Sequence, residues 1–188
     1  MMKKINNFEK FLEKLLNEIG DSSAQSYEVR RTDDKMGYLF KTDSGVNYII
    51  SFQFIDENVI DNIKLKNVGI FDYEEFYKSN ILVGFAVLKQ DIEKIRNLSD
   101  IVNFDQDVVT NKFEMFRIMS TVTKVIDDVL SKNSRLKYIV FGGYGSNNDN
   151  GRKRSLFYLQ YIKKRNYNSS LSDIIHTQYG DCYILKIK

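Results

Sequence analysis

The chain has 188 residues, of which 43% are hydrophobic and 28% are charged. This balance predicts one globular domain with a buried core, and it excludes a disordered tail or a collagen-like fibre. No apolar run approaches the roughly 18 residues that a membrane-spanning helix needs. The single cysteine, Cys182, excludes an internal disulfide and a cysteine-based metal cage.

Residue types with AT-rich codons, above all Lys, Asn, Ile, Tyr and Phe, dominate the sequence, while proline and tryptophan do not occur. We interpret this bias as the mark of a gene from an AT-rich bacterium or a bacteriophage. The net charge of +3 is unevenly distributed, because residues 1–131 carry 17 basic and 22 acidic side chains, whereas residues 132–188 carry 11 and 3. Such a basic segment is typical of a surface for nucleic acid or an acidic partner, and also of a solvated helix face.

The first part of the chain predicts a helix followed by strands. Apolar residues recur at helical spacing over residues 3–19, and a polar connector ends at Ser26. Because this helix is amphipathic rather than an apolar signal core, we expect a location in the bacterial cytoplasm or in a virion, without secretion. A short strand is expected at Tyr27–Arg31, followed by a hairpin with arms Met36–Thr42 and Val46–Ile55.

The middle of the chain predicts a buried strand and a long helix. Residues 56–79 have no clean period, and we expect a short strand and a helical turn there. Ile81–Leu88 is almost continuously apolar, which is typical of a central strand covered on both faces. Residues 110–131 have a strong helical period, and Leu136–Phe141 predicts a second buried strand.

The last part of the chain begins with a loop rich in Gly and Asn over residues 142–151. A basic helix over residues 152–165 and a hairpin with arms near Ile174–His176 and Asp181–Ile187 follow. This order of elements predicts the α+β class: one domain over residues 1–188, with a central mixed or antiparallel sheet flanked by helices.

Two groups of residues carry a resemblance to a known family. Phe113–Val129, which leads into Leu136–Phe141, stands where a cofactor-binding helix and its next strand would be. Arg154–Tyr158, followed by Tyr161, looks like a late helix that carries a tyrosine. On these segments, residues 80–188 resemble the C-terminal half of the GNAT (N-acetyltransferase) fold. The chain is also similar to the GNAT-like proteins that tailed bacteriophages encode, which implies a GNAT-like single domain.

In working acetyltransferases of this family, a Q/R-x-x-G-x-G/A loop binds the pyrophosphate of acetyl-CoA at a helix N-terminus. The corresponding stretch begins at Gln106, which fits the first position of that loop. Val109 and Asn111 stand where small residues are needed, because a Cβ holds the diphosphate away from the backbone. Asp105 and Asp107 add negative charge. The resemblance therefore implies a degenerate acetyl-CoA site, and we expect no cofactor and no enzymatic activity.

Two other functions stay open at this point. An active N-acetyltransferase would use acetyl-CoA, and by the resemblance Tyr158 or Tyr161 would protonate the leaving thiolate. A small nucleic-acid-binding module would contact phosphates with the basic side chains of the C-terminal helix and stack bases on its tyrosines. These basic side chains are Arg152, Lys153, Arg154, Lys163, Lys164 and Arg165.

The sequence offers few residues for other catalytic, phosphate-binding or metal sites. His176 is the single histidine and lies in an expected strand, so we expect a structural role for it, and Cys182 is expected to be a small buried hydrophobe. The loop Gly142–Ser146 lacks the lysine of a P-loop. Adjacent carboxylates such as Glu74 and Glu75 diverge on a helix, and we expect no metal site.

The combined expectation is a non-catalytic or degenerate GNAT-like domain. We expect it to be a phage-encoded structural component of a virion or a protein-interaction component. Its expected partners are other protein subunits, with nucleic acid as an alternative and no membrane.

Overall fold

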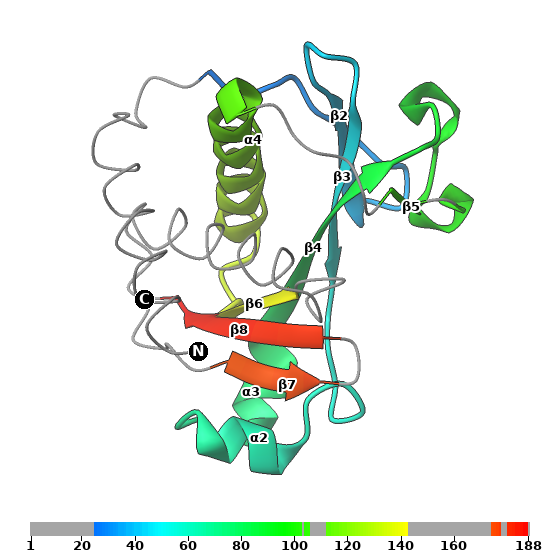
Figure 1. The fold of residues 1–188 in the computed structure, drawn as a ribbon. Helices are drawn as coiled ribbons and strands as arrows, with labels where there is room; N and C mark the ends of the chain where they lie inside the picture. Colours follow the sequence, from blue (N-terminus) through cyan, green and yellow to red (C-terminus); the bar gives the residue numbers. More distant parts are fainter. Residues whose placement is uncertain (1–24, 103, 106–111, 143–173, 178–179, 188) are drawn as a thin grey trace, which may run out of the picture.

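The apolar and amphipathic strand segments of the sequence form one eight-stranded mixed sheet, with helices on both of its faces (Figure 1). The structure is a computed structural model that describes residues 25–102, 104–105, 112–142, 174–177 and 180–187. Its strands are β1 (Arg30–Arg31), β2 (Gly37–Lys41), β3 (Asn47–Gln53), β4 (Asn80–Leu88), β5 (Phe104–Asp105), β6 (Tyr138–Gly142), β7 (Ile174–Thr177) and β8 (Gly180–Lys186). Its helices are α2 (Asn62–Asn67), α3 (Tyr73–Ser79) and α4 (Lys112–Ser131), with short 3-10 helices η2 (Ile92–Lys94) and η3 (Leu98–Asp100). The expected α+β class with a central mixed sheet is confirmed.

The strand order is β1-β2-β3-β4-β6-β8-β7, with β5 added beside β4. Among the described strands, neighbours are antiparallel except for β4 and β6, which run parallel because α4 lies between them in the chain. β6 pairs with the residues Asn80 to Val83 of β4, and β5 pairs with Val87 and Leu88 of β4. The sheet therefore divides along β4: β2, β3 and β4 stand upright in Figure 1, while β6, β8 and β7 run across the lower part of the view.

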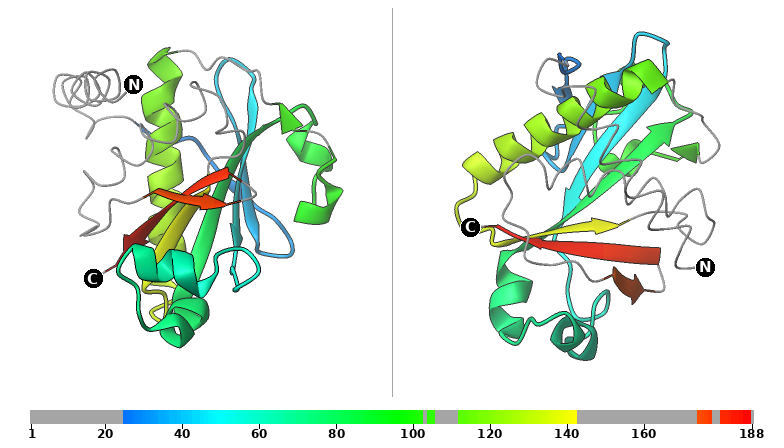
Figure 2. Two further views of the ribbon diagram at one scale, coloured as in Figure 1. Left: turned by 60° about the horizontal axis from the view of Figure 1, so that its bottom comes forward. Right: turned by 60° about the vertical axis from the view of Figure 1, so that its left-hand side comes forward.

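One face of the sheet is covered by the apolar side of α4 (Figure 2). The helix contributes Ile118, Met119, Val122, Val125 and Ile126 to the largest core cluster. Their spacing of three and four residues puts them on one side of the helix. They share this cluster with alternate residues of the strands, such as Ile50 of β3 and Val83 of β4. Burying each aliphatic side chain of this kind stabilises the fold by about 1.5–3 kcal/mol.

The opposite face of the sheet is covered in two places. The helices α2 and α3 cover the part near β6 and β8, where Leu65 and Phe76 join Val140. The η2–η3 segment covers the other part, where Ile92 and Leu88 belong to a third cluster. Because β4 contributes to all of these clusters, it is covered on both faces, as the sequence predicts.

Most of the expected elements in the described residues are confirmed, but residues 56–79 need a correction. They form α2 and α3, and no strand. An aspartate caps each helix: Asp61 accepts the Lys64 N–H (2.9 Å), and Asp72 accepts the Glu75 N–H (2.9 Å). Helices of 6 and 7 residues are too short to show a period, so these N-caps are the signal that predicts them.

Further differences concern the ends of the chain and one long connection. The strand expected at Tyr27–Arg31 shortens to β1, because the Tyr27 N–H donates to Thr121 Oγ1 of α4 (2.8 Å) instead of joining the sheet. The connection from β4 to α4 contains η2, η3 and β5, which we did not predict. The helices expected at residues 3–19 and 152–165 lie outside the described residues. Within the part of the chain that the structure describes, no helix has both the length and the apolar composition to cross a membrane.

β4 begins at a polar side chain that is fully buried, Asn80. Its Oδ1 accepts the Ile55 N–H (3.0 Å), and its Nδ2 donates to the carbonyl oxygens of Ile55 (2.9 Å) and Phe76 (3.0 Å). One amide group thereby serves backbone groups at the end of β3 and in the last turn of α3, which have no ladder partner there. Asn80 joins the α2–α3 segment to the central strand.

Asn80→Ala leaves these backbone groups buried without a partner. We expect it to lower the free energy of unfolding by about 2–4 kcal/mol, measured by urea denaturation. Asn67→Ala, at the exposed end of α2, is the matched control and is expected to change the stability by less than about 0.5 kcal/mol. Equal stability of the two variants would contradict the role of Asn80.

Candidate functional site

The site residues that the sequence predicts lie outside the residues that the structure describes. They are Gln106, Val109, Asn111, Arg152, Lys153, Arg154, Tyr158, Tyr161, Lys163, Lys164 and Arg165. Their roles in binding a cofactor or nucleic acid stay predictions. The first three precede α4 directly, and the structure describes what surrounds the start of that helix.

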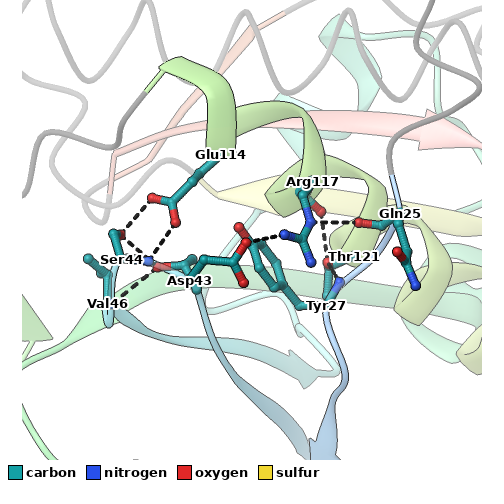
Figure 3. A network of polar contacts seen from close by, with 9 residues as sticks. Gln25, Tyr27, Asp43, Ser44, Val46, Glu114, Arg117 and Thr121 are labelled. Carbon is teal, nitrogen blue, oxygen red and sulfur yellow. Dashed lines mark hydrogen bonds and ion pairs between the residues drawn. The ribbon is translucent and has the colours of Figure 1, made fainter.

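The start of α4 holds the turn between β2 and β3 (Figure 3). Two neighbouring residues of this turn are bound, Ser44 by Glu114 and Asp43 by Arg117. The ring of Tyr27 lies against Arg117. We call these five residues the α4 anchor. The turn and the helix are far apart in the sequence, so the anchor exists only because the hairpin packs against the helix.

The Glu114 carboxylate is nearly buried, with 8% of the residue exposed. One carboxylate oxygen accepts the Ser44 N–H (2.8 Å) and the other accepts the Ser44 hydroxyl (2.6 Å). Burial by itself would raise the pKa of this carboxyl, but hydrogen bonding outweighs burial, first from Ser44 and then from the Thr42 and Tyr27 hydroxyls, and the pKa lies below the ordinary value of 4.5. Glu114 is therefore charged at neutral pH, in the first turn of α4, where the helix dipole favours a negative charge.

Arg117 lies one turn further along α4 and has three contacts. Its Nε donates to the Gln25 carbonyl (3.0 Å), and the guanidinium pairs with Asp43. Its Cζ lies 4.0 Å from the centroid of the Tyr27 ring, which is a cation–π geometry. Because the Asp43 side chain is 71% exposed, water screens the ion pair, and it contributes about 1 kcal/mol or less.

Four aromatic rings continue from Arg117 across the sheet. Tyr27 stacks on Phe40 of β2, with ring centroids 5.7 Å apart. Phe40 stacks on Tyr48 of β3 (5.1 Å), and Tyr48 stacks on Phe85 of β4 (5.2 Å). Pairs of this kind contribute about 0.5–1.5 kcal/mol each beyond their buried area. The row connects the α4 anchor to the central strand, so the start of α4 has a defined position relative to β4.

The Tyr27 hydroxyl is buried near the Glu114 carboxylate but makes no hydrogen bond of normal geometry with the described residues. Burial raises the pKa of this phenol, the Arg117 guanidinium partly offsets that effect, and the charge of Glu114 adds to it. The hydroxyl therefore stays protonated at neutral pH. A raised pKa makes it a weaker acid than an ordinary tyrosine.

The α4 anchor is suited to holding structure rather than to catalysis. A general base needs a pKa near the working pH, and the pKa of Glu114 is shifted away from it. The Ser44 hydroxyl accordingly faces a carboxylate that is a poor proton acceptor. Among the described residues, no group of three or more His, Cys, Asp or Glu side chains gathers as metal ligands.

The structure also shows the contacts or the burial of other residues that the sequence analysis singled out. Glu74 pairs with Lys78 on its own helix and Glu75 pairs with Lys137, so the two carboxylates diverge as expected. Cys182 is 5% exposed in the cluster beneath α2 and α3, which confirms the expected burial. β7 contains the position of His176, whose side chain is outside the described part.

The sequence analysis missed the α4 anchor, although it predicted both elements that form it. Only one local signal points to it: Glu114 and Arg117 lie three residues apart near the start of a helix, where a carboxylate is favoured and a partner is needed. Their partners, Ser44 and Asp43, belong to an ordinary hairpin turn.

No family model, no curated protein and no solved structure matches this chain.

Glu114→Gln removes the charge of the α4 anchor and keeps its shape. Because the pKa in the folded state is depressed, Glu114 contributes stability above its ordinary value of 4.5 and loses it as the pH falls through the folded pKa. We expect the variant to be less stable by about 1–2 kcal/mol at neutral pH, and to lose less stability than wild type on acidification. Urea denaturation at a series of pH values, from neutral pH to below 4.5, measures both effects. The exposed Glu57→Gln is the control, and a variant with the pH profile of wild type would contradict the assignment.

Tyr27→Phe removes a buried hydroxyl that makes no hydrogen bond of normal geometry with the described residues, and it keeps the ring stack. We expect the free energy of unfolding to stay within about 0.5 kcal/mol of wild type or to rise. The matched control is Tyr38→Phe, because the Tyr38 hydroxyl donates to Asp128 (2.9 Å), and this variant should lose about 1–2 kcal/mol. Equal losses at both positions would show that the Tyr27 hydroxyl has a partner.

Proposed function

We propose that this chain is a GNAT-like domain that has no acetyl transfer activity and that functions by binding other protein subunits, as a structural or interaction component of a bacteriophage particle. The observation that carries the absence of acetyl transfer in this proposal is the charged Glu114 in the first turn of α4. The parallel strands β4 and β6, with α4 between them in the chain, support the GNAT-like part.

The helix start that would receive the cofactor already carries an anion. By the resemblance, the diphosphate of acetyl-CoA would lie at the N-terminal end of α4. Two unit negative charges about 7 Å apart repel each other by about 2 kcal/mol at an effective dielectric constant of 20. Arg117, the cation that would offset Glu114, is paired with Asp43. The charge of Glu114 therefore opposes binding of the diphosphate, and the side chains of Val109 and Asn111 oppose it as well.

Exposed apolar side chains support the protein-binding part of the proposal. The large hydrophobic residues that the structure leaves most exposed are Met36, Phe54, Ile63, Phe71, Val102 and Phe104, with exposed fractions from 41% to 74%. Three of the six are phenylalanines and one is a methionine, and aromatic residues and Met are enriched where proteins bind one another.

Calorimetric titration with acetyl-CoA tests the proposal. We expect no heat of binding and no shift of the melting temperature at about 1 mM cofactor, which is a binding free energy weaker than about −4 kcal/mol. Glu114→Gln and the control Glu57→Gln are titrated in parallel, and a gain of binding in the first alone would identify Glu114 as an obstacle. Micromolar binding by wild type, with transfer of the acetyl group to any amine, would overturn the proposal.

An active N-acetyltransferase is the second candidate, and the division of the sheet favours it. Among the described strands, β6 pairs with β4 up to Val83 and β5 pairs with it from Val87, and a stretch of strand edge between two partners is a place where an extended chain adds by main-chain hydrogen bonds. The extended arm of acetyl-CoA has the amide groups for this. If the titration shows binding, Tyr158→Phe and Tyr161→Phe identify the residue that protonates the thiolate.

A further inference from the structure

The α2–α3 segment, residues 54–79, has one side in the core and one side exposed to solvent. Leu65 of α2 and Phe76 of α3 are fully buried in the second core cluster. Ile63 stands two positions before Leu65, which is about 200° around a helix, and it is 74% exposed. Phe71, in the connection from α2 to α3, is 69% exposed. The outer side of the segment therefore presents large apolar side chains to the solvent.

Two tyrosines of α3 lie at the junction of the two helices. Tyr73 and Tyr77 are one helical turn apart on the same side of α3, and both rings are only partly buried. The Tyr77 hydroxyl donates to the Ile60 carbonyl just before α2 (2.8 Å). It also lies 2.9 Å from Oδ1 of Asn62, the residue before Ile63. The tyrosine rings therefore add aromatic surface beside the start of α2.

Carboxylates surround the same junction. Burial raises the pKa of the Tyr77 hydroxyl, and the negative charges of Glu57, Asp61 and Asp56 raise it further. These charges act on the hydroxyl because their carboxylates lie near it. Negative potential therefore adjoins the partly exposed tyrosine rings.

The positive charges of the segment do not cancel this potential. Residues 54–79 contain six acidic and three basic side chains. Two of the three lysines already pair with carboxylates of the segment, and Lys137, from outside it, pairs with Glu75. Acidic side chains are still in excess, so the outer side is both apolar and negative.

We propose that the outer side of the α2–α3 segment binds a basic and partly apolar segment of a different protein subunit. This inference rests on the proposed protein-binding function, and it names the surface and the chemistry of the partner. Lysine and arginine side chains of the partner pair with carboxylates such as Glu57, and their aliphatic stems lie on the rings of Tyr73 and Tyr77. Apolar side chains of the partner contact Ile63 and Phe71.

Charge complementarity selects this partner over the others that an apolar surface can bind. Nucleic acids and anionic lipid surfaces carry negative charge, and the α2–α3 segment repels them. A second copy bound by an isologous contact puts the same acidic surface on both sides, so like charges oppose each other. A wholly apolar partner takes carboxylates out of water without pairing them. A segment with both basic and apolar side chains avoids both of these penalties.

Fluorescence anisotropy with three synthetic peptides tests the inference. Each peptide has about 15 residues, the length at which an isolated helix becomes marginally stable. The first has leucines on one side of the helix and lysines on the other, the second has glutamates in place of the lysines, and the third has serines in place of the leucines. At about 0.1 M salt we expect micromolar binding of the first peptide and about tenfold weaker binding of the other two. We expect the affinity for the first peptide to fall about tenfold at about 1 M salt, as the Debye length falls from about 10 Å to about 3 Å.

Four variants at exposed positions locate the binding surface. Ile63→Ser is matched by Val102→Ser, because the two side chains are 74% and 72% exposed and Val102 lies outside the segment. Glu57→Lys is matched by Glu28→Lys, which reverses an exposed charge elsewhere. We expect Ile63→Ser to weaken binding of the lysine–leucine peptide about tenfold and Glu57→Lys about fivefold, while both controls stay within about twofold of wild type. Circular dichroism checks that every variant is folded.

The inference is overturned if the lysine–leucine peptide does not bind, if the glutamate peptide binds equally well, or if the control variants weaken binding as much as Ile63→Ser and Glu57→Lys do. Sedimentation velocity adds one further outcome, since a wild-type dimer that Ile63→Ser abolishes would replace the basic partner by a second copy. Binding of the glutamate peptide that only Val102→Ser weakens would overturn the inference and leave the proposed protein-binding function standing. None of these results depends on the acetyl-CoA titration.

Discussion

The fold depends on one constraint, which is that β4 is apolar on both faces and must be covered on both. The long apolar side of α4 covers one face, and its 20 residues extend along the upright strands. The other face has no single long helix. Two short segments share it, α2 and α3 at one end and η2 and η3 at the other, and each brings its own small cluster of aliphatic side chains. The parallel pairing of β4 with β6 follows from the same arrangement, since a helix that covers the sheet returns the chain to the end where β4 began.

The position of α4 is defined by polar contacts as well as by its apolar side. A helix that packs on a sheet by aliphatic side chains alone is free to slide by small amounts, because such contacts have little direction. The two hydrogen bonds between Glu114 and Ser44 and the stack of Arg117 on Tyr27 do have direction. The aromatic row then connects this point to β4. The Glu114 carboxylate in the first turn already interacts with the positive end of the helix dipole, so the residue that positions α4 also disfavours a second negative charge there.

Charge is unevenly distributed along the chain, because residues 54–79 contain six acidic and three basic side chains, whereas residues 132–188 contain 3 and 11. The α2–α3 segment lies over β6 and β8 on the face opposite α4, and it joins the rest of the fold through the buried amide of Asn80. Its outer side has the properties of a binding surface, whereas its inner side belongs to the core. Lys137 links it to the strand β6, because this side chain, just before the strand, pairs with Glu75 of α3.

The sequence by itself determined the long and strongly periodic elements. The hairpin of β2 and β3, the apolar strand β4, the helix α4 and the terminal hairpin of β7 and β8 all follow from local patterns, because each is long enough to show its period and each buries one face or two. The buried state of Cys182 follows from its apolar neighbours in the same way. α2, α3, η2 and η3 have seven residues or fewer, which is less than the pattern needs, and only their capping side chains indicate them.

Tertiary structure alone decided which distant groups meet. Glu114 and Ser44 are 70 residues apart, and Arg117 and Asp43 are 74 apart, so neither residue type nor local spacing predicts either pair. The low pKa of Glu114, the buried hydroxyl of Tyr27 and the hydrogen bonds of Asn80 to Ile55 and Phe76 depend on burial and on partners that only the folded chain supplies. Local sequence decides where an element forms because short-range sterics and hydrophobic spacing act within one turn or one strand. The electrostatic character of a side chain is decided by what packs around it, and that is a property of the whole fold.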